Sequence, residues 1–80
     1  MVDETRRPVR VTSYAGHRAD VEPRCVDLGA GPVRVRAVVD RWRTPHAEGF
    51  VVLLEDGNLW RLVHDPAADT WEAVWLRRTH

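Results

Sequence analysis

The second half of the chain, residues 32–76, reads as four β-strands separated by short turns, and three of these strands contain tryptophan. Apolar and polar residues alternate there with the period of two that half-buried strands show. Helical periodicity nowhere extends beyond about one turn. The pattern predicts a small all-β domain, either an SH3-like, partly open barrel or a strongly bent antiparallel meander of five to six strands.

The expected strands follow from this alternation and from the glycine and proline residues between them. They cover residues 9–14, 24–28, 33–42, 50–55, 58–64 and 71–76. Val38 and Val39 are adjacent apolar residues, so the third strand needs a β-bulge or a sharp coil there. Asp56-Gly57 predicts a tight type I′ hairpin. Residues 50–54 are apolar at every position, which predicts a central strand that is well covered on both faces.

The length of the chain allows one domain. A protein of 80 residues buries only about 60% of the surface of its unfolded chain, which leaves room for one core and a shallow groove. We expect residues 1–7 to form a flexible tail, residues 8–76 to form the domain and residues 77–80 to fray. The segment 15–23 is a long loop for so small a protein, and long ordered loops often carry function.

Twelve arginines, with no lysine, balance twelve acidic residues. A neutral total argues against strong sequence-independent binding of nucleic acid and against a polybasic membrane tether. The preference for arginine has two explanations, which are recognition of phosphate or carboxylate groups and codon usage in a GC-rich bacterial genome.

Several features indicate a cytoplasmic setting. Cys25 is the only cysteine, which excludes an internal disulfide and fits a reducing compartment. The N-terminal residues lack the apolar segment of a secretory signal. No apolar run approaches the roughly 20 residues that a membrane helix needs.

A set of short motifs extends over almost the whole chain past the tail. They are Ser13–Asp20, Pro23-Arg24, Val35, Val38–Trp42, Phe50–Val52, Asp56-Gly57, Leu62 and Trp71. Together they make the chain resemble an uncharacterised family of small bacterial proteins, catalogued as a domain of unknown function. The resemblance implies a bacterial, cytoplasmic protein and implies no reaction. Some members of that family resemble neighbours of DNA-repair polymerases in actinobacteria. The chain departs from the family pattern at His17, where an aromatic residue is usual, and at Val21, where an acidic residue is usual.

Two segments combine aromatic and arginine residues. The loop region 14–24 contains Tyr14, His17, Arg18, Asp20 and Arg24. Its arginines can serve as charge-assisted donors beside a stacking tyrosine, which would make a polar recognition patch. In the alternative interpretation Asp20 and Arg24 pair to hold the loop, and Tyr14 covers the edge of the core.

The second segment is Arg41-Trp42-Arg43. An aromatic residue between arginines can stack on bases while the arginines hold phosphates. Alternation, however, points Trp42 to one face and both arginines to the other, so the alternative is a core tryptophan with solvated arginines. The other tryptophans are expected in the core or at the barrel ends: Trp60, Trp71 and Trp75.

No catalytic or metal-binding motif is recognisable. The histidines have no metal-ligand spacing relative to one another or to Cys25. The pair His64-Asp65 has the composition of a histidine oriented by a carboxylate, as hydrolases require. Because Ser13 is the only serine and stands in no nucleophile context, we expect instead a strand-end histidine beside a turn aspartate.

These observations predict a non-catalytic binding or adaptor module with no cofactor and no metal. Its contact surface is expected at the 14–24 loop with the rim near Trp42 and Arg43, or at an open strand edge. The expected partner is another protein, and the alternative is nucleic acid in a role linked to DNA repair. We expect a monomer or a weak homodimer through a strand edge. An enzyme would need a pocket that joins at least two of Cys25, His17, His46 and His64.

Overall fold

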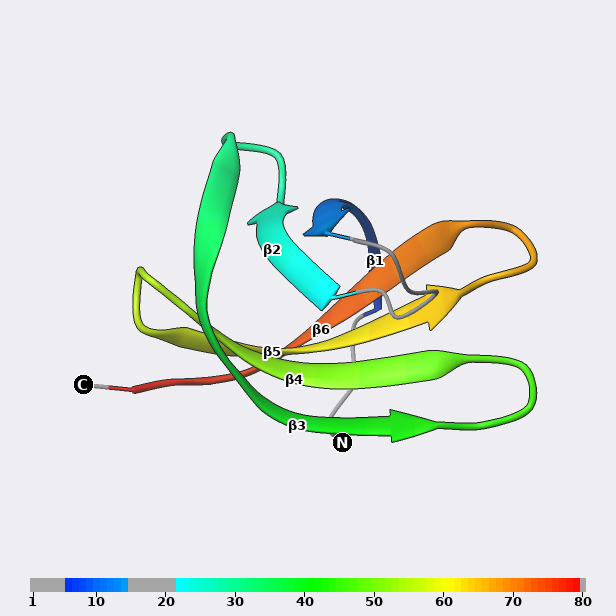
Figure 1. The fold of residues 1–80 in the computed structure, drawn as a ribbon. Coiled ribbons are helices and arrows are strands. Elements are labelled where there is room, and N and C mark those ends of the chain that lie inside the picture. The colour runs from blue at the N-terminus through cyan, green and yellow to red at the C-terminus, as the bar shows by residue number, and fades with distance from the viewer. Residues whose placement is uncertain (1–5, 15–21, 80) are drawn as a thin grey trace, which may run out of the picture.

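A computed structural model describes residues 6–14 and 22–79 of the chain. Six antiparallel strands follow one another in chain order around a closed barrel (Figure 1). They are β1 (Arg7–Tyr14), β2 (Glu22–Asp27), β3 (Pro32–Arg43), β4 (Glu48–Leu54), β5 (Asn58–Asp65) and β6 (Thr70–Arg78). The all-β prediction is confirmed. The barrel is closed rather than partly open because Arg7–Val9 of β1 pair with Trp71–Ala73 of β6.

Most strands extend slightly beyond their predicted ends. β1 begins at Arg7 and β6 ends at Arg78, inside the segments expected as tails. β2 begins at Glu22, within the expected loop. Pro23 is fully buried and pairs with Ser13 where the β1–β2 register is irregular, a position at which the missing N–H of proline is tolerated. The expected tail residues 1–5 and loop residues 15–21 lie outside the described residues.

β3 is the longest strand, and it bends where its alternation slips. Its pairing with β4 is irregular between Val35 and Ala37 and again between Val38 and Asp40. The second irregularity confirms the predicted bulge. Because bulges bend a strand and increase its twist, β3 curves from β2 at one end of the barrel to the β3–β4 hairpin at the other (Figure 1).

The β4–β5 turn differs from the predicted type I′ turn. Gly57 has a φ of 88°, but Asp56 has no positive φ. The Gly57 N–H donates to the carbonyl of Leu54 at 3.0 Å, and the Asn58 N–H donates to Oδ1 of Asp56 at 3.0 Å. This is the longer hairpin loop that ends in one left-handed glycine. The Asp56 carboxylate, by binding Asn58, supports the wider turn.

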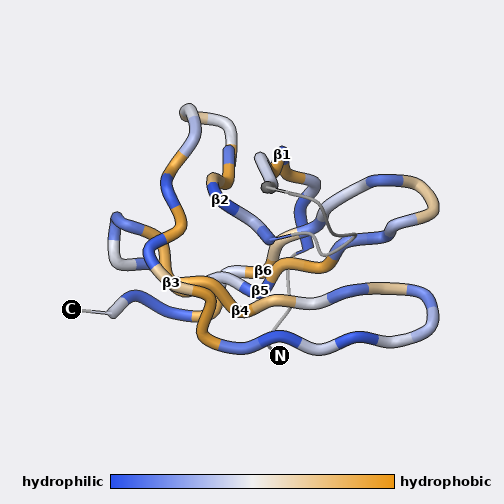
Figure 2. The backbone as a smooth tube through the Cα atoms, viewed as in Figure 1, coloured by the Kyte–Doolittle hydropathy of each residue, from blue (hydrophilic) through white to orange (hydrophobic). Residues whose placement is uncertain are grey.

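The core fills the inner face of the barrel. Its buried cluster comprises Val26, Phe50, Val52, Leu54, Trp60, Leu62, Trp71 and Ala73. Successive side chains of a strand point to opposite faces, so the alternate residues Phe50, Val52 and Leu54 share the inner face of β4. Hydrophobic residues gather where β3 to β6 cross the middle of the molecule, and the β3–β4 turn is mainly hydrophilic (Figure 2). The other β4 residues, Val51 and Leu53, point outward and are only half-buried, so the prediction of cover on both faces holds for the inner face alone.

The difference between the two faces can be measured with a matched pair of variants. Leu62 is fully buried in the core cluster, whereas Leu53 is half-buried on the outer face. Leu62→Ala should lower the free energy of unfolding by about 2–5 kcal/mol, because it leaves a cavity. Leu53→Ala should cost about 1 kcal/mol or less, because less apolar surface is buried there. Urea denaturation followed by circular dichroism measures both values, and equal losses would contradict the assignment of faces.

Candidate binding surface

The outer face of the sheet β3–β6 carries several large apolar side chains beside charged ones. The strand register aligns three rows of residues on this face, which are Trp42–Gly49–Val63, Asp40–Val51–Arg61–Val74 and Ala37–Leu53–Leu59. We define the larger apolar side chains in these rows as the outer patch: Trp42, Val51, Leu53, Leu59, Val63 and Val74. The patch follows β4 and extends to β3 on one side and to β5 and β6 on the other.

The outer patch is separate from the core. Leu59 and Val74 are buried, yet neither belongs to the core cluster, so the outer face holds a second, smaller apolar cluster. Trp42 is 39% exposed, and Val39 at the β3 bulge beside the patch is 60% exposed. Val51, Leu53 and Val63 are half-buried. Part of this apolar surface is therefore in contact with water, as is typical of an interaction site.

Trp42 owes its position to a glycine on the neighbouring strand. A Cβ built on Gly49 would overlap atoms Cε2 and Cζ2 of the Trp42 ring, so the indole lies directly over Gly49. An aromatic side chain in this position covers backbone that the glycine leaves bare. The interpretation of Trp42 as a core tryptophan is therefore wrong, whereas Trp60 and Trp71 are core residues and Trp75 is 53% exposed.

Arg41 and Arg43 point to the opposite face, at the end of the barrel. The Arg41 guanidinium carbon lies 5.8 Å from the centroid of the Phe50 ring, and one of its nitrogens lies 3.9 Å from the Glu22 carboxylate. Arg43 donates to Glu48 at 2.9 Å. Both guanidiniums thus have carboxylate neighbours, which reduces the positive charge available to a phosphate.

The structure describes only some of the predicted site residues. His17, Arg18 and Asp20 lie outside the described residues. The backbone of Tyr14 ends β1 and pairs with Glu22, and Arg24 lies exposed on β2. The Glu22–Arg41 ion pair joins the end of the predicted loop region to β3. Trp42 lies on the opposite side of β3 from Arg41 and Arg43, because it belongs to the outer patch.

His64 occupies the inner face near the same end of the barrel. It is 5% exposed, and its ring stacks on Trp71 with centroids 4.3 Å apart. Nε2 lies 3.0 Å from Oδ1 of Asp69. Nδ1 lies 3.6 Å from Oε1 of Glu48 and has no hydrogen-bond partner within the described chain. The imidazole therefore lies between two carboxylates and is oriented by Asp69.

The carboxylate that orients His64 is not its sequence neighbour. Asp65 accepts hydrogen bonds from the backbone of Ala67 and Ala68 and so stabilises the β5–β6 turn. Asp69 has a left-handed backbone with φ of 52°, a conformation that aspartate tolerates better than most residues. Glu48 approaches His64 through the β4–β5 register.

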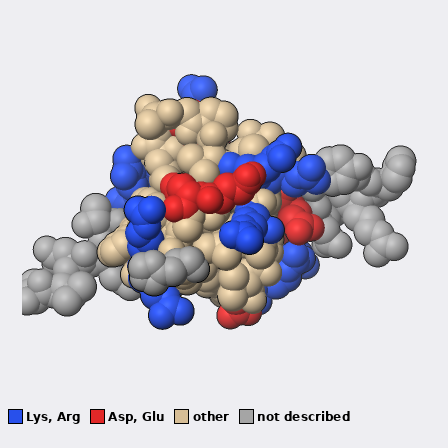
Figure 3. Space-filling view, turned by 90° about the vertical axis from the view of Figure 1, so that its left-hand side faces the viewer, with Lys and Arg blue, Asp and Glu red and all other residues tan. Residues whose placement is uncertain are grey.

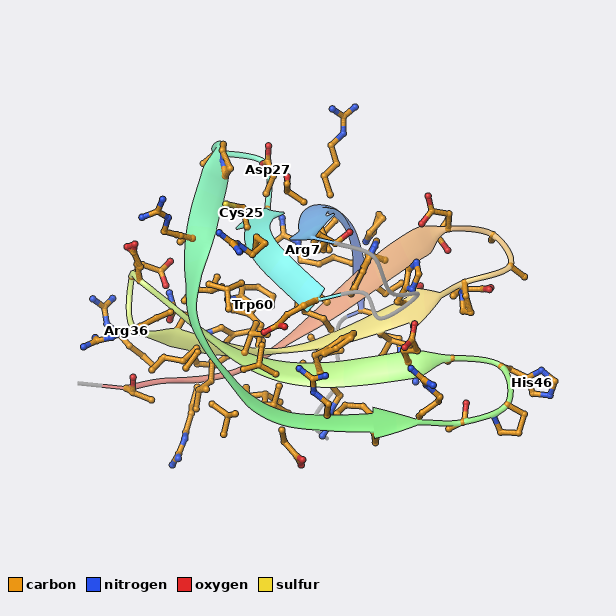
Figure 4. All side chains as sticks on the ribbon, viewed as in Figure 1. Arg7, Cys25, Asp27, Arg36, His46 and Trp60 are labelled. Atoms are coloured by element: carbon orange, nitrogen blue, oxygen red, sulfur yellow. The ribbon has the colours of Figure 1, made fainter. Side chains whose placement is uncertain are left out.

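Two hollows flank β1. One of about 490 Å³ is lined by residues 8–13 of β1 and by Asp69, Thr70 and Trp71. The other, of about 440 Å³, is lined by residues 8–10 and 27–29. Neither of these two hollows includes Cys25, His46 or His64 in its lining. Cys25 lies on β2 and His46 at the tip of the β3–β4 turn, well apart (Figure 4).

Charged side chains are mixed on the face beside the β4–β5 turn. Acidic side chains occupy the middle of this face, and arginines lie on both sides of them (Figure 3). The β4–β5 turn itself carries Glu55 and Asp56. On this face, therefore, the arginines do not form an unbroken basic surface of the kind that binds nucleic acid.

No family model, curated protein or solved structure matches the chain. The resemblance to the bacterial family of unknown function thus stays a prediction. No helix among the described residues is long and apolar enough to cross a membrane. Within residues 6–14 and 22–79, no three His, Cys, Asp or Glu side chains are grouped so that they could hold a metal ion.

Gly49→Ala tests the contact that places Trp42 in the outer patch. The added methyl needs the space of the indole, so we expect a loss of about 1–3 kcal/mol in the free energy of unfolding. In a Trp42→Ala background the same substitution should cost far less, because the clash is absent. Equal costs in the two backgrounds, measured as a double-mutant cycle by urea denaturation, would contradict the contact.

Proposed function

We propose that this chain is a non-catalytic protein-binding module that contacts its partner through the outer patch. One observation carries the proposal. The inner faces of β4, β5 and β6 supply most of the core cluster, and the outer faces of the same strands carry further apolar side chains beside Arg61 and Glu72. A domain does not need this second apolar surface for its own core, and burial against a partner would remove it from water.

The charges around the outer patch favour a protein over nucleic acid. The charged residues aligned with the patch include both signs, with Asp40 and Arg61 in one row and Glu72 and Arg77 at the margin. Arg41 and Arg43 lie beside carboxylates on the opposite face. Affinity for nucleic acid comes largely from uncompensated positive charge, whereas protein interfaces combine an apolar centre with a polar rim.

The placement of the reactive side chains supports a non-catalytic role. Cys25, His46 and His64 belong to different elements and line neither of the two hollows beside β1. His64 is held between Glu48 and Asp69 and stacked on Trp71. This arrangement stabilises the end of the barrel.

Capture of partner proteins from a lysate tests the surface. The double variant Val51→Asp with Leu53→Glu places two charges in the outer patch, and we expect it to lose the proteins that the unchanged chain retains, as identified by mass spectrometry. The matched control, Arg18→Ala with Arg24→Ala, alters the surface predicted from sequence and should retain them. Loss with the control and retention with the outer-patch variant would contradict the proposal.

The nucleic-acid alternative can be tested with the unchanged chain by its tryptophan fluorescence. Titration with single-stranded DNA at low salt should leave the intrinsic tryptophan fluorescence of the unchanged chain unaltered. A change that appears at low salt and disappears at high salt would replace protein with nucleic acid as the partner.

A further inference from the structure

The outer patch has a pattern that is complementary to itself. Gly49, Val51 and Leu53 form an uncharged stripe along β4. Asp40 on β3 and Arg61 on β5 lie in the same row on either side of Val51. Neighbouring strands are roughly 4.8 Å apart, so the acidic and the basic residue flank the stripe at equal distances.

From this pattern we infer that the outer patch docks a second copy of the same chain. This inference rests on the proposed function, because it assigns a partner to the same surface. A two-fold axis along β4 brings β3 of one copy over β5 of the other. Asp40 then faces Arg61 of the second copy, and Arg61 faces its Asp40, so the same contact forms twice in one isologous interface.

The apolar residues match under the same operation. The Trp42 indole lies over Gly49 of β4, beside the axis, so the indoles of the two copies pack against each other there. Val51 and Leu53 meet their own counterparts on the axis. Sheets that pack face to face lie about 10 Å apart with nearly aligned strands, and an arginine paired with an aspartate can span that gap.

Contacts within each chain are compatible with this pairing. Oδ1 of Asp40 accepts the backbone N–H of Arg41 at 2.8 Å, and a carboxylate has further acceptor sites. Arg61 has a contact within its own chain, and a guanidinium has five donors. Both groups can therefore add an intermolecular bond.

The outer patch is small for a dimer interface. Three facing strands, β3 to β5, at about 4.8 Å spacing and five residues at about 3.3 Å make a face of roughly 240 Å². Stable interfaces bury about 800 Å² on each partner. The dimer is therefore weak, and its measurement needs protein concentrations from about 10 µM to about 1 mM.

A charge exchange tests the two-fold arrangement. We would measure sedimentation equilibrium of the unchanged chain, of Asp40→Arg, of Arg61→Asp and of an equimolar mixture of these two variants. Each variant alone faces like charges at both contacts, so its association should weaken about tenfold or more. In the mixture, position 40 of one variant faces position 61 of the other, and both contacts again join opposite charges. Association should therefore return to within a few-fold of that of the unchanged chain.

Recovery in the mixture shows that the variants are folded and that the two positions face each other. Circular dichroism checks folding independently, and a dilution series of amide chemical shifts in the unchanged chain maps the contact without any substitution. Shifts confined to the outer patch are expected. A mixture that associates no better than its components, or shifts elsewhere on the barrel, would overturn the inference.

The outcomes also separate this inference from the proposed function. If the unchanged chain stays monomeric to about 1 mM while Val51→Asp with Leu53→Glu still loses a captured protein, self-association is wrong and the outer patch serves another protein. If the chain is monomeric and the double variant retains every captured protein, both proposals fail.

Discussion

Apolar packing on both sides of β4 is the constraint on which this structure depends. Phe50, Val52 and Leu54 enter the core on one side, where they meet side chains of β5 and β6. The intervening Val51 and Leu53 cannot turn inward, because the strand fixes alternate side chains on opposite faces. Burial of Phe50, Val52 and Leu54 in the core therefore places Val51 and Leu53 in the outer patch.

The end of the barrel near His64 is polar, unlike its apolar middle. At this end, Glu48 is shared between Arg43 and His64, and Asp69 orients the same imidazole. Burying a polar ring in so small a core is unfavourable unless it is paired, and the stack on Trp71 provides apolar contact in addition. Arg43 and Glu48 therefore lie away from the outer patch, whose charged neighbours are Asp40 on β3 and Arg61 on β5.

Alternation and turn residues are sufficient to predict six strands and the bulge at Val38–Val39, because both are local properties. The type of the β4–β5 turn is harder to predict from the sequence, since the hydrogen bond from the Asn58 N–H to the Asp56 carboxylate favours the wider loop. The outer patch is predictable only in part. The apolar run in β4 is visible in the sequence, but Leu59, Val63 and Val74 join it through strand register, which one sequence does not reveal. For the same reason the sequence points to Asp65 as the neighbour of His64 instead of Asp69 and Glu48.

Methyl NMR with a soluble paramagnetic gadolinium chelate measures the two faces of β4 most directly. In a dilute sample the methyls of Val51, Leu53 and Val63 should relax strongly, and those of Val52, Leu54 and Leu62 should be protected. Raising the protein concentration should protect the first group alone, as the outer patch becomes covered. Equal protection of both groups in the dilute sample would contradict the claim that this small barrel exposes a second apolar surface.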